Sequence, residues 1–119
     1  MQFHRITLEA LVELKKAVFV YAKIAGADFD GVLAAIDVLL SIEMPSPRIP
    51  LLYDTIMDGV GGCSVQVEVG SDSWLERLLS HATMLKALQE WNRFFMADTD
   101  LLEKETLRRL EAAPHHPVN

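Results

Sequence analysis

Few residues in this chain have the type and spacing that catalysis or metal binding requires. His81 is the one histidine within an amphipathic helical pattern, and no carboxylate lies three or four residues from it. We therefore expect a hydrogen-bonded structural histidine and not a general base or a ligand. Cys63, the only cysteine, is expected to be a small apolar residue and not a catalytic thiolate. His115 and His116 lie between prolines, where we expect a tail that binds no metal.

The sequence motifs of common cofactor and metal sites are absent. The glycine-rich run at 59–62 lacks the Lys-Ser/Thr pair that would complete a phosphate-binding loop. The sequence contains no HExxH, CxxC or Glu-x-x-His motif, and no serine stands in a GxSxG setting. We therefore predict no catalytic residues, no cofactor and no metal, and a protein that is not an enzyme.

Apolar surface is the more informative feature of the chain. Helical spacing places Met84, Leu88, Trp91 and Phe95 on one stripe, and Phe94 widens it on the other flank. Trp, Phe and Met are enriched at the centres of protein interfaces. We predict these five side chains as the partner-binding residues. The alternative is that Trp91 and Phe95 are core residues and only Phe94 is exposed.

The composition limits the class of protein. The chain has 119 residues, half of them apolar, with a formal net charge of -6. The acidic balance argues against direct nucleic-acid binding, because phosphate contacts need a basic surface. We expect a single helical domain over 1–113 with a disordered tail at 114–119. The N-terminus lacks a signal-peptide layout and no run is long enough to cross a bilayer, so we predict a cytoplasmic protein without membrane contact.

The spacing of apolar residues predicts an all-α, bundle-like domain of four to five helices with one short extended segment. Expected helices run from Thr7 to about Gly26, from about 30 to 43, from 51 to about 57 and from Ser73 through 96, with a last helix starting at Asp98 or Asp100. The segment 63–69 alternates apolar and polar residues, and it either packs across helices or pairs as an edge strand. The helix near 31–42 is apolar almost all round, which predicts a central helix or a homodimer contact.

The segment 88–95, LQEWNRFF, together with the size, charge and helical layout, resembles the small anti-activators that bind LuxR-type quorum-sensing regulators. The resemblance implies a non-enzymatic regulator of transcription that sequesters or blocks a partner protein through an apolar helical face. An acidic inhibitor would be attracted to a basic DNA-binding regulator, which would speed their encounter.

Two other functions stay open at the level of sequence. The chain could be a small enzyme or ligand-binding bundle whose pocket lies near His81, Tyr53 and Trp74. It could also be a structural subunit of a phage or secretion assembly. A deep pocket lined by polar groups would favour the former.

Overall fold

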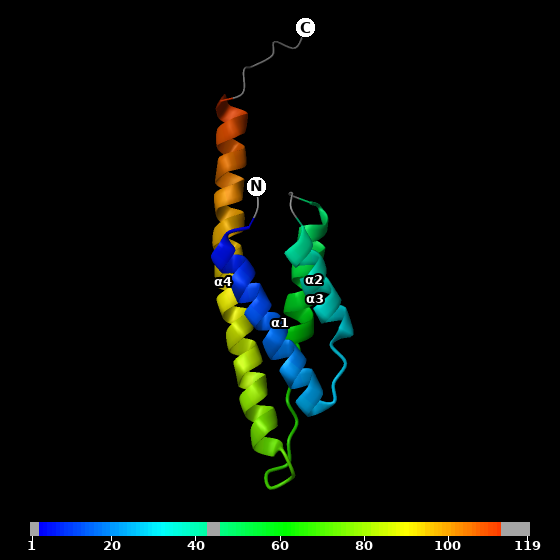
Figure 1. Ribbon diagram of the computed structural model, residues 1–119. Helices are drawn as coiled ribbons and strands as arrows, with labels where there is room; N and C mark the ends of the chain where they lie inside the picture. The colour runs from blue at the N-terminus through cyan, green and yellow to red at the C-terminus, as the bar shows by residue number, and fades with distance from the viewer. Residues whose placement is uncertain (1–2, 43–45, 113–119) are drawn as a thin grey trace.

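The computed structural model describes residues 3–42 and 46–112, and over these residues it contains four helices and no strand (Figure 1). This confirms the predicted all-α fold. Within the same residues, no helix combines the length and the apolar character that crossing a bilayer demands. The helices are α1 Arg5–Ala25, α2 Asp30–Ser41, α3 Arg48–Gly61 and α4 Trp74–Ala112.

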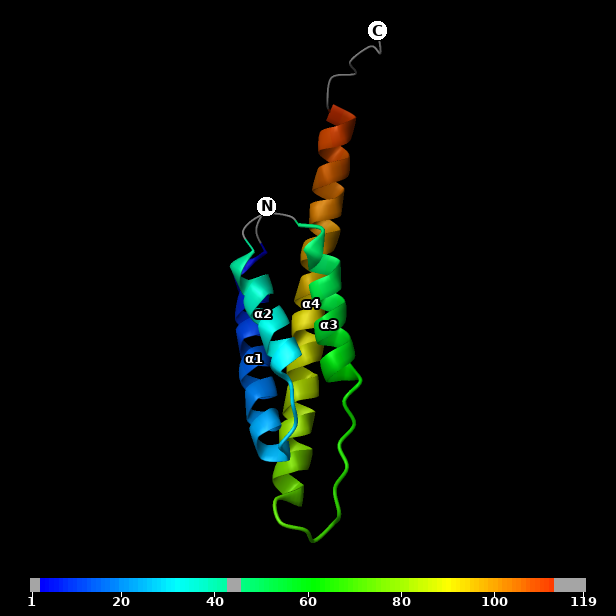
Figure 2. The same ribbon diagram turned by 90° about the vertical axis from the view of Figure 1, so that its right-hand side faces the viewer.

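The four helices form an elongated bundle. α1 packs mainly against α4 and α2 against α3, and neighbouring helices in the chain run in opposite directions (Figure 2). α4 is the longest element, and its end rises clear of the other three helices in both views. The most extensive contact between two helices is therefore the one between α1 and α4.

Local sequence sets the helix ends. α1 ends where Gly26 takes a φ of 63°, a left-handed conformation that favours glycine. The backbone N–H of Asp30 donates to the Asp28 carboxylate at 2.9 Å at the start of α2. α3 begins at Arg48, three residues before the predicted start, because Pro50 in a first turn loses no helical hydrogen bond.

α2 is buried on one face, against α1 and α3, so it is not the central helix that one of the two sequence interpretations predicted, and a homodimer contact through α2 stays a prediction. Val32, Ile36 and Leu39 are buried, whereas Asp37 is exposed and pairs with Lys15 at 2.6 Å. The packing against α3 is close, since a Cβ at Gly59 would collide with the Cγ2 atom of Val32. Glycine at 59 is therefore needed for this approach of the two helices.

Two stripes with the same spacing build the main seam of the fold. Buried residues follow one another at alternating steps of four and three along α1 and along α4, which is the period of paired helices. Because α1 and α4 are antiparallel, the start of one stripe faces the end of the other. The stripes are Thr7, Leu11, Leu14, Val18 and Tyr21 on α1, and Met84, Leu88, Trp91, Phe95 and Asp98 on α4.

Thr7 and Asp98, each predicted to start a helix, instead bond to each other. The Thr7 hydroxyl donates to the Asp98 carboxylate at 2.6 Å, and the backbone N–H of His4 donates to the same oxygen at 2.9 Å. α1 consequently starts at Arg5, and no helix starts at Asp98 or Asp100. The predicted last helix was wrong because Asp98 continues the buried stripe of an unbroken α4 of 39 residues.

The segment 63–69 is extended but belongs to no strand within the described residues. Of its apolar residues, Cys63, Val65 and Val67 are half-buried, whereas Val69 is 82% exposed. Cys63 packs against the core, so the interpretation of a segment packed across helices holds only for the start of the segment. Pairing of its edge with a second chain stays a prediction.

Candidate functional site

Four of the five predicted partner-binding residues are core residues. Met84 and Trp91 are 0% exposed, and Leu88 and Phe95 are 4% and 5% exposed. The stripe of α1 covers them, and Tyr53 of α3 stacks on Phe95 with ring centroids 4.7 Å apart. The predicted stripe is therefore not a surface that a partner can reach, and the alternative interpretation of Trp91 and Phe95 is the one the structure supports.

Phe94 is the only residue of the predicted set that stays near the surface. It is half-buried, and the Arg93 guanidinium carbon lies 5.0 Å from the centroid of its ring. A cation above an aromatic face is an ordinary surface contact of modest strength. Phe94 alone is too small an anchor to define a binding face.

The residues of the suggested ligand pocket do not converge. Nε2 of His81 lies 3.0 Å from the carbonyl oxygen of Cys63, and its ring meets Tyr21 edge-on. The Tyr53 hydroxyl instead donates to Oδ1 of Asn92 at 2.5 Å. Eleven residues of α4 separate His81 from Asn92, which corresponds to about 16 Å along a helix. His81 thus has the hydrogen-bonded, partly buried setting expected of a structural histidine.

Burial changes the chemistry of the two tyrosines. Loss of hydration raises the pKa of Tyr21, and its hydrogen bond with the thiol of Cys63 raises it further. Burial also raises the pKa of Tyr53, with a smaller contribution from the negative charge of Asp54. Both hydroxyls are therefore held in the neutral form, which suits packing and not proton transfer near neutral pH.

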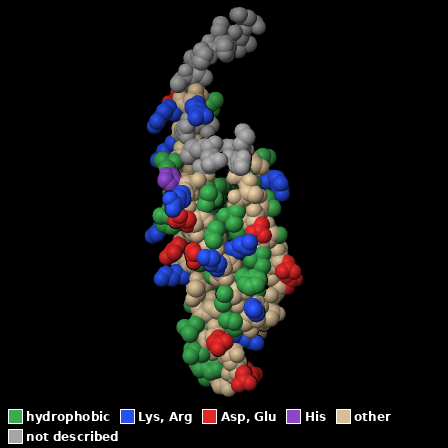
Figure 3. Space-filling view, in the orientation of Figure 1, with side chains coloured by type: hydrophobic (Ala, Val, Ile, Leu, Met, Phe, Trp, Pro, Cys, Tyr) green, Lys and Arg blue, Asp and Glu red, His purple; other side chains and the backbone are tan. Residues whose placement is uncertain are grey.

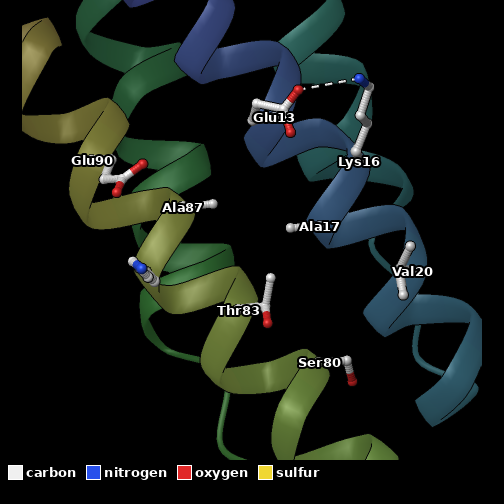
Figure 4. Close-up of a pocket in the computed structure, with 9 residues that line it drawn as sticks. Glu13, Lys16, Ala17, Val20, Ser80, Thr83, Ala87 and Glu90 are labelled. Carbon is white, nitrogen blue, oxygen red and sulfur yellow. Dashed lines mark hydrogen bonds and ion pairs between the residues drawn. The ribbon is translucent and has the colours of Figure 1, made fainter.

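A groove between α1 and α4 is a surface site that the sequence did not identify (Figure 4). It has a volume of about 480 Å³. Ala17 of α1 and Ala87 of α4 point toward each other across it, and Val20 lies further along the same side of α1. The walls are completed by Ser80, Thr83 and Glu90 of α4 with Glu13 and Lys16 of α1, and by Lys86.

Small side chains create this groove. Ser80, Thr83 and Ala87 follow at steps of three and four, so they share one face of α4 beside the buried stripe. Ala17 stands opposite on α1, and these short side chains leave the space between the helices unfilled. Val20 lies in this gap with 49% of its surface exposed.

Charges of both signs surround the apolar part of the groove. Nζ of Lys16 lies 3.1 Å from a carboxylate oxygen of Glu13, and both side chains are more than half exposed. On the α4 side of the groove, Lys86 contributes a positive charge and Glu90 a negative charge. Figure 3 shows hydrophobic side chains on this face with acidic and basic ones among and beside them. An apolar strip with a mixed polar rim is the usual layout of a protein-binding surface.

The sequence contained a signal for this groove. Val20 and Ile24 lie outside the apolar stripe of the first helix, and small residues flank the stripe of the last one. Large aromatic side chains drew the prediction to Trp91 and Phe95, but such residues fill cores as readily as interfaces. Small residues beside the buried stripe of a helix therefore indicate a groove between two helices better than the large residues of the stripe do.

Among the residues that the structure describes, no three histidine, cysteine or acidic side chains lie close enough to hold a metal ion. Comparison of the chain with protein-family models, with curated proteins and with solved structures returns no match.

Proposed function

We propose that this protein is a non-enzymatic regulator that binds another protein in the groove between α1 and α4. The observation that carries the proposal is the groove itself, with apolar Ala17, Val20 and Ala87 inside and charged residues around it. A surface of this kind can exclude water from apolar side chains and can orient a partner through its rim. The proposal moves the binding site of the predicted regulator from the buried stripe of α4 to its neighbouring face.

The occupant that fits the groove is an amphipathic helix. The lining residues of α4 extend from Ser80 to Glu90. This span corresponds to about 15 Å, or about three helical turns. A partner helix would place apolar side chains at positions i, i+3 or i+4, and i+7 against Ala17 and Ala87. The short side chains there allow its backbone to approach α1 and α4 closely.

Charge favours a basic partner. The chain carries a net charge of -6, so a basic protein is attracted to it over a long range. DNA-binding regulators are basic because they contact phosphates. We propose that the partner is such a regulator and that the protein sequesters it, in the manner of the anti-activators of LuxR-type regulators. Occupation of one of the partner's amphipathic helices would block its dimerisation or its access to DNA.

A synthetic helix tests the groove directly. The probe is a labelled peptide of about 18 residues with leucines on one face and lysines on the other, and a second peptide carries glutamates in place of the lysines. We expect the lysine peptide to bind at micromolar concentration and to shift the amide resonances of Ala17, Val20 and Ala87. Equal binding of the glutamate peptide would contradict the charge argument, and shifts confined to another face would contradict the groove.

Two matched variants separate the groove from the rest of α4. Thr83 and Ala82 are adjacent and exposed, but only Thr83 lines the groove. Thr83→Arg should weaken binding of the lysine peptide about tenfold or more, which corresponds to about 1.4 kcal/mol. Ala82→Arg introduces the same charge and should leave binding unchanged. Equal effects of the two variants would mean that the groove does not hold the peptide.

The natural partner can be found from the same position. A photo-crosslinking residue at Thr83 in the full chain, compared with one at Ala82, should capture a protein in cells through the first position only. Identification of that protein by mass spectrometry, followed by a gel-shift assay, tests its class. A DNA-binding protein that releases DNA when this chain is added supports the proposal. A captured enzyme whose activity is unchanged would overturn the regulatory function.

A further inference from the structure

The segment that connects α3 to α4 holds a row of backbone groups without partners. Within the described part of the chain, the N–H and C=O groups of Val65, Gln66 and Val67 form no hydrogen bond. In Figure 2 the segment runs at the margin of the molecule, and no other described element lies on its outer side in that view. Extended backbone with a free edge is a template on which a second strand can pair.

The side chains of this segment alternate as those of a half-buried strand do. Val65 and Val67 are half-buried, whereas Ser64, Gln66 and Glu68 are exposed. One side of residues 64–68, here called the linker segment, therefore carries the apolar side chains and the other side carries the polar ones. β-branched valines favour such an extended backbone. The two valines are only partly covered by this chain, so a second strand beside them would complete their cover.

A turn ends the linker segment and decides which of its groups are free. The backbone N–H of Ser71 donates to the carbonyl oxygen of Glu68 at 3.0 Å, and the Ser71 hydroxyl donates to the same oxygen at 2.6 Å. Gly70 has a φ of 92°, as the third residue of a type II turn requires. Because the Glu68 carbonyl is already in use, the groups open to a second strand are those of Val65 and Val67.

We propose that the linker segment pairs with the linker segment of a second copy of this chain in antiparallel orientation. A two-fold axis at Gln66 brings Val65 opposite the second copy's Val67, and these two residues exchange backbone hydrogen bonds. The same axis repeats the exchange in reverse. The apolar side chains of both copies then lie on one face of the pair and the polar side chains on the other.

The sequence of the linker segment selects this occupant and this orientation. In the antiparallel pair Ser64 lies opposite the second copy's Glu68, and the two Glu68 carboxylates lie at opposite ends. Parallel copies in register would place Glu68 against Glu68, and like charges directly opposite each other destabilise a strand pair. A shift by one residue would place the valines opposite polar side chains. The linker segment is thus complementary to itself in one arrangement.

The pair is independent of the proposed binding function. It uses none of the residues that line the α1/α4 groove. It assigns the homodimer expected from the sequence to the linker segment and not to the helix at 31–42. Failure of the pair would leave the groove untouched, and failure of the groove would leave the pair intact.

Sedimentation of the full chain tests the pair. We expect a shift from 13.3 kDa toward twice that mass, with a dissociation constant on the order of 100 micromolar because the contact is small. The amides of Val65 and Val67 should exchange with deuterated water more slowly as the protein concentration rises, whereas those of α1 and α4 should not change. A monomer at every concentration up to about 1 mM would overturn the proposal. An open series of larger oligomers would also overturn it.

A charge at Ser64 tests the orientation without a change to the core. Ser64→Lys meets the second copy's Glu68 at both ends of the pair and should tighten self-association about threefold or more, whereas Ser64→Glu should weaken it by a similar factor. Because Ser64 is exposed, both variants should keep the melting temperature of the parent chain. In a parallel pair each charge would face its own copy, so weakening by both variants would contradict the proposal.

Two proline variants test the use of the backbone. Proline has no N–H, so Val67→Pro removes a donor of the pair and should weaken self-association about tenfold or more. Val69→Pro places the same residue at the second position of the turn, where proline is favoured, and should leave self-association unchanged. Equal effects of the two variants would mean that the backbone edge is not the contact.

Crosslinking locates the two-fold axis. In a Cys63→Ser background, Gln66→Cys should form a disulfide-linked dimer, because the axis brings this position opposite itself with a Cα distance of about 4.5 Å. Glu68→Cys should not crosslink to itself, because its two copies lie about 13 Å apart along the pair. A mixture of Ser64→Cys and Glu68→Cys chains should form the heterodimer. Efficient crosslinking of Glu68→Cys to itself would demonstrate a parallel arrangement and overturn the proposal.

Discussion

The two ends of α4 have different surroundings. From Met84 to Asp98, every member of the stripe is at most 9% exposed. Beyond Asp98, Leu102 continues the spacing of the stripe and is only half-buried, and Leu101, Leu107 and Leu110, which lie off the line of the stripe, are each more than half exposed. The difference lies in the neighbour, because the matching stripe of α1 begins at Thr7 and covers only the first part of α4. Burial of a helix face depends on the partner opposite it as much as on its own residues.

The boundary between the two parts is polar. The Asp98 carboxylate accepts hydrogen bonds from the Thr7 hydroxyl and the His4 backbone, so a charge lies at the end of an apolar seam. A carboxylate there is satisfied only when α1 and α4 have the right register. The pair therefore specifies the alignment of the two helices at the point where their contact ends.

Truncation in the covered part should have the largest effect. Trp91 is fully buried, and its ring packs against Phe95 and Tyr53. Trp91→Ala should lower the free energy of unfolding by about 3–5 kcal/mol, which is comparable to the whole stability of a small domain. Circular dichroism melts should show a much lower melting temperature or no cooperative transition.

The uncovered part provides the contrast. Leu107→Ala, in the part of α4 beyond Asp98, should change the free energy of unfolding of the bundle by less than about 0.5 kcal/mol. Phe94→Ala should lie between the two, near 1 kcal/mol, because Phe94 is half-buried. A stable Trp91→Ala protein would mean that the seam is not the core, and the partner-binding interpretation of the stripe would return.

Removal of the boundary pair should have the next largest effect. Asp98→Ala leaves the Thr7 hydroxyl and the His4 N–H without their acceptor, at a cost of about 2 kcal/mol. Thr7→Val alone should cost about 1 kcal/mol, and the two changes together should cost less than their sum. Denaturant melts of the four proteins in the cycle measure the coupling. Strict additivity would show that the hydrogen bond contributes nothing to the register.

The fold class and most of the helices were predictable from the spacing of apolar residues. The end of α1 at Gly26 follows from a local preference that tertiary contacts do not override. α4 also starts just after Ser73, as predicted, but Ser73 has a φ of 64° and not the extended backbone of an N-cap. The continuity of α4 through Asp98 was not predictable from capping rules, because Thr and Asp serve equally as helix caps and as buried bonding partners. Their steps of four and three from Leu11 and Phe95 were the evidence that both belong to stripes.

The candidate site was less predictable than the fold. A sequence shows which side chains are large and apolar, but it does not show which helix covers them. The groove arises from small residues such as Ala17 and Ala87, whose lack of volume matters only once α1 and α4 are side by side. The same limitation applies to His81 and Tyr53, which were grouped as one pocket, although Tyr53 of α3 bonds to Asn92, about three turns of α4 away from His81.

A smaller effect is expected at the lower end of the covered seam. His81→Gln should lower the free energy of unfolding by about 1 kcal/mol, because the bond to the Cys63 carbonyl and the contact with the Tyr21 ring are disturbed. Binding of the lysine peptide should not change, since His81 does not line the groove. A fully stable variant that no longer binds the peptide would assign His81 to the site and contradict its structural role.

The last effect is the change of the free energy of unfolding with pH that the two partly buried tyrosines produce. Burial raises the pKa of Tyr21 and Tyr53 above the unfolded value of 10.0. The folded state therefore binds more protons than the unfolded state above that pH, and the free energy of unfolding should fall as the pH rises beyond it. Below that pH both states keep the hydroxyls protonated, so the tyrosines add no pH dependence there.

Urea melts between about pH 8 and about pH 11 measure the slope. The chain has only these two tyrosines, so a variant with Tyr21→Phe and Tyr53→Phe should show a flatter profile. An equally steep profile would mean that folding buries neither hydroxyl.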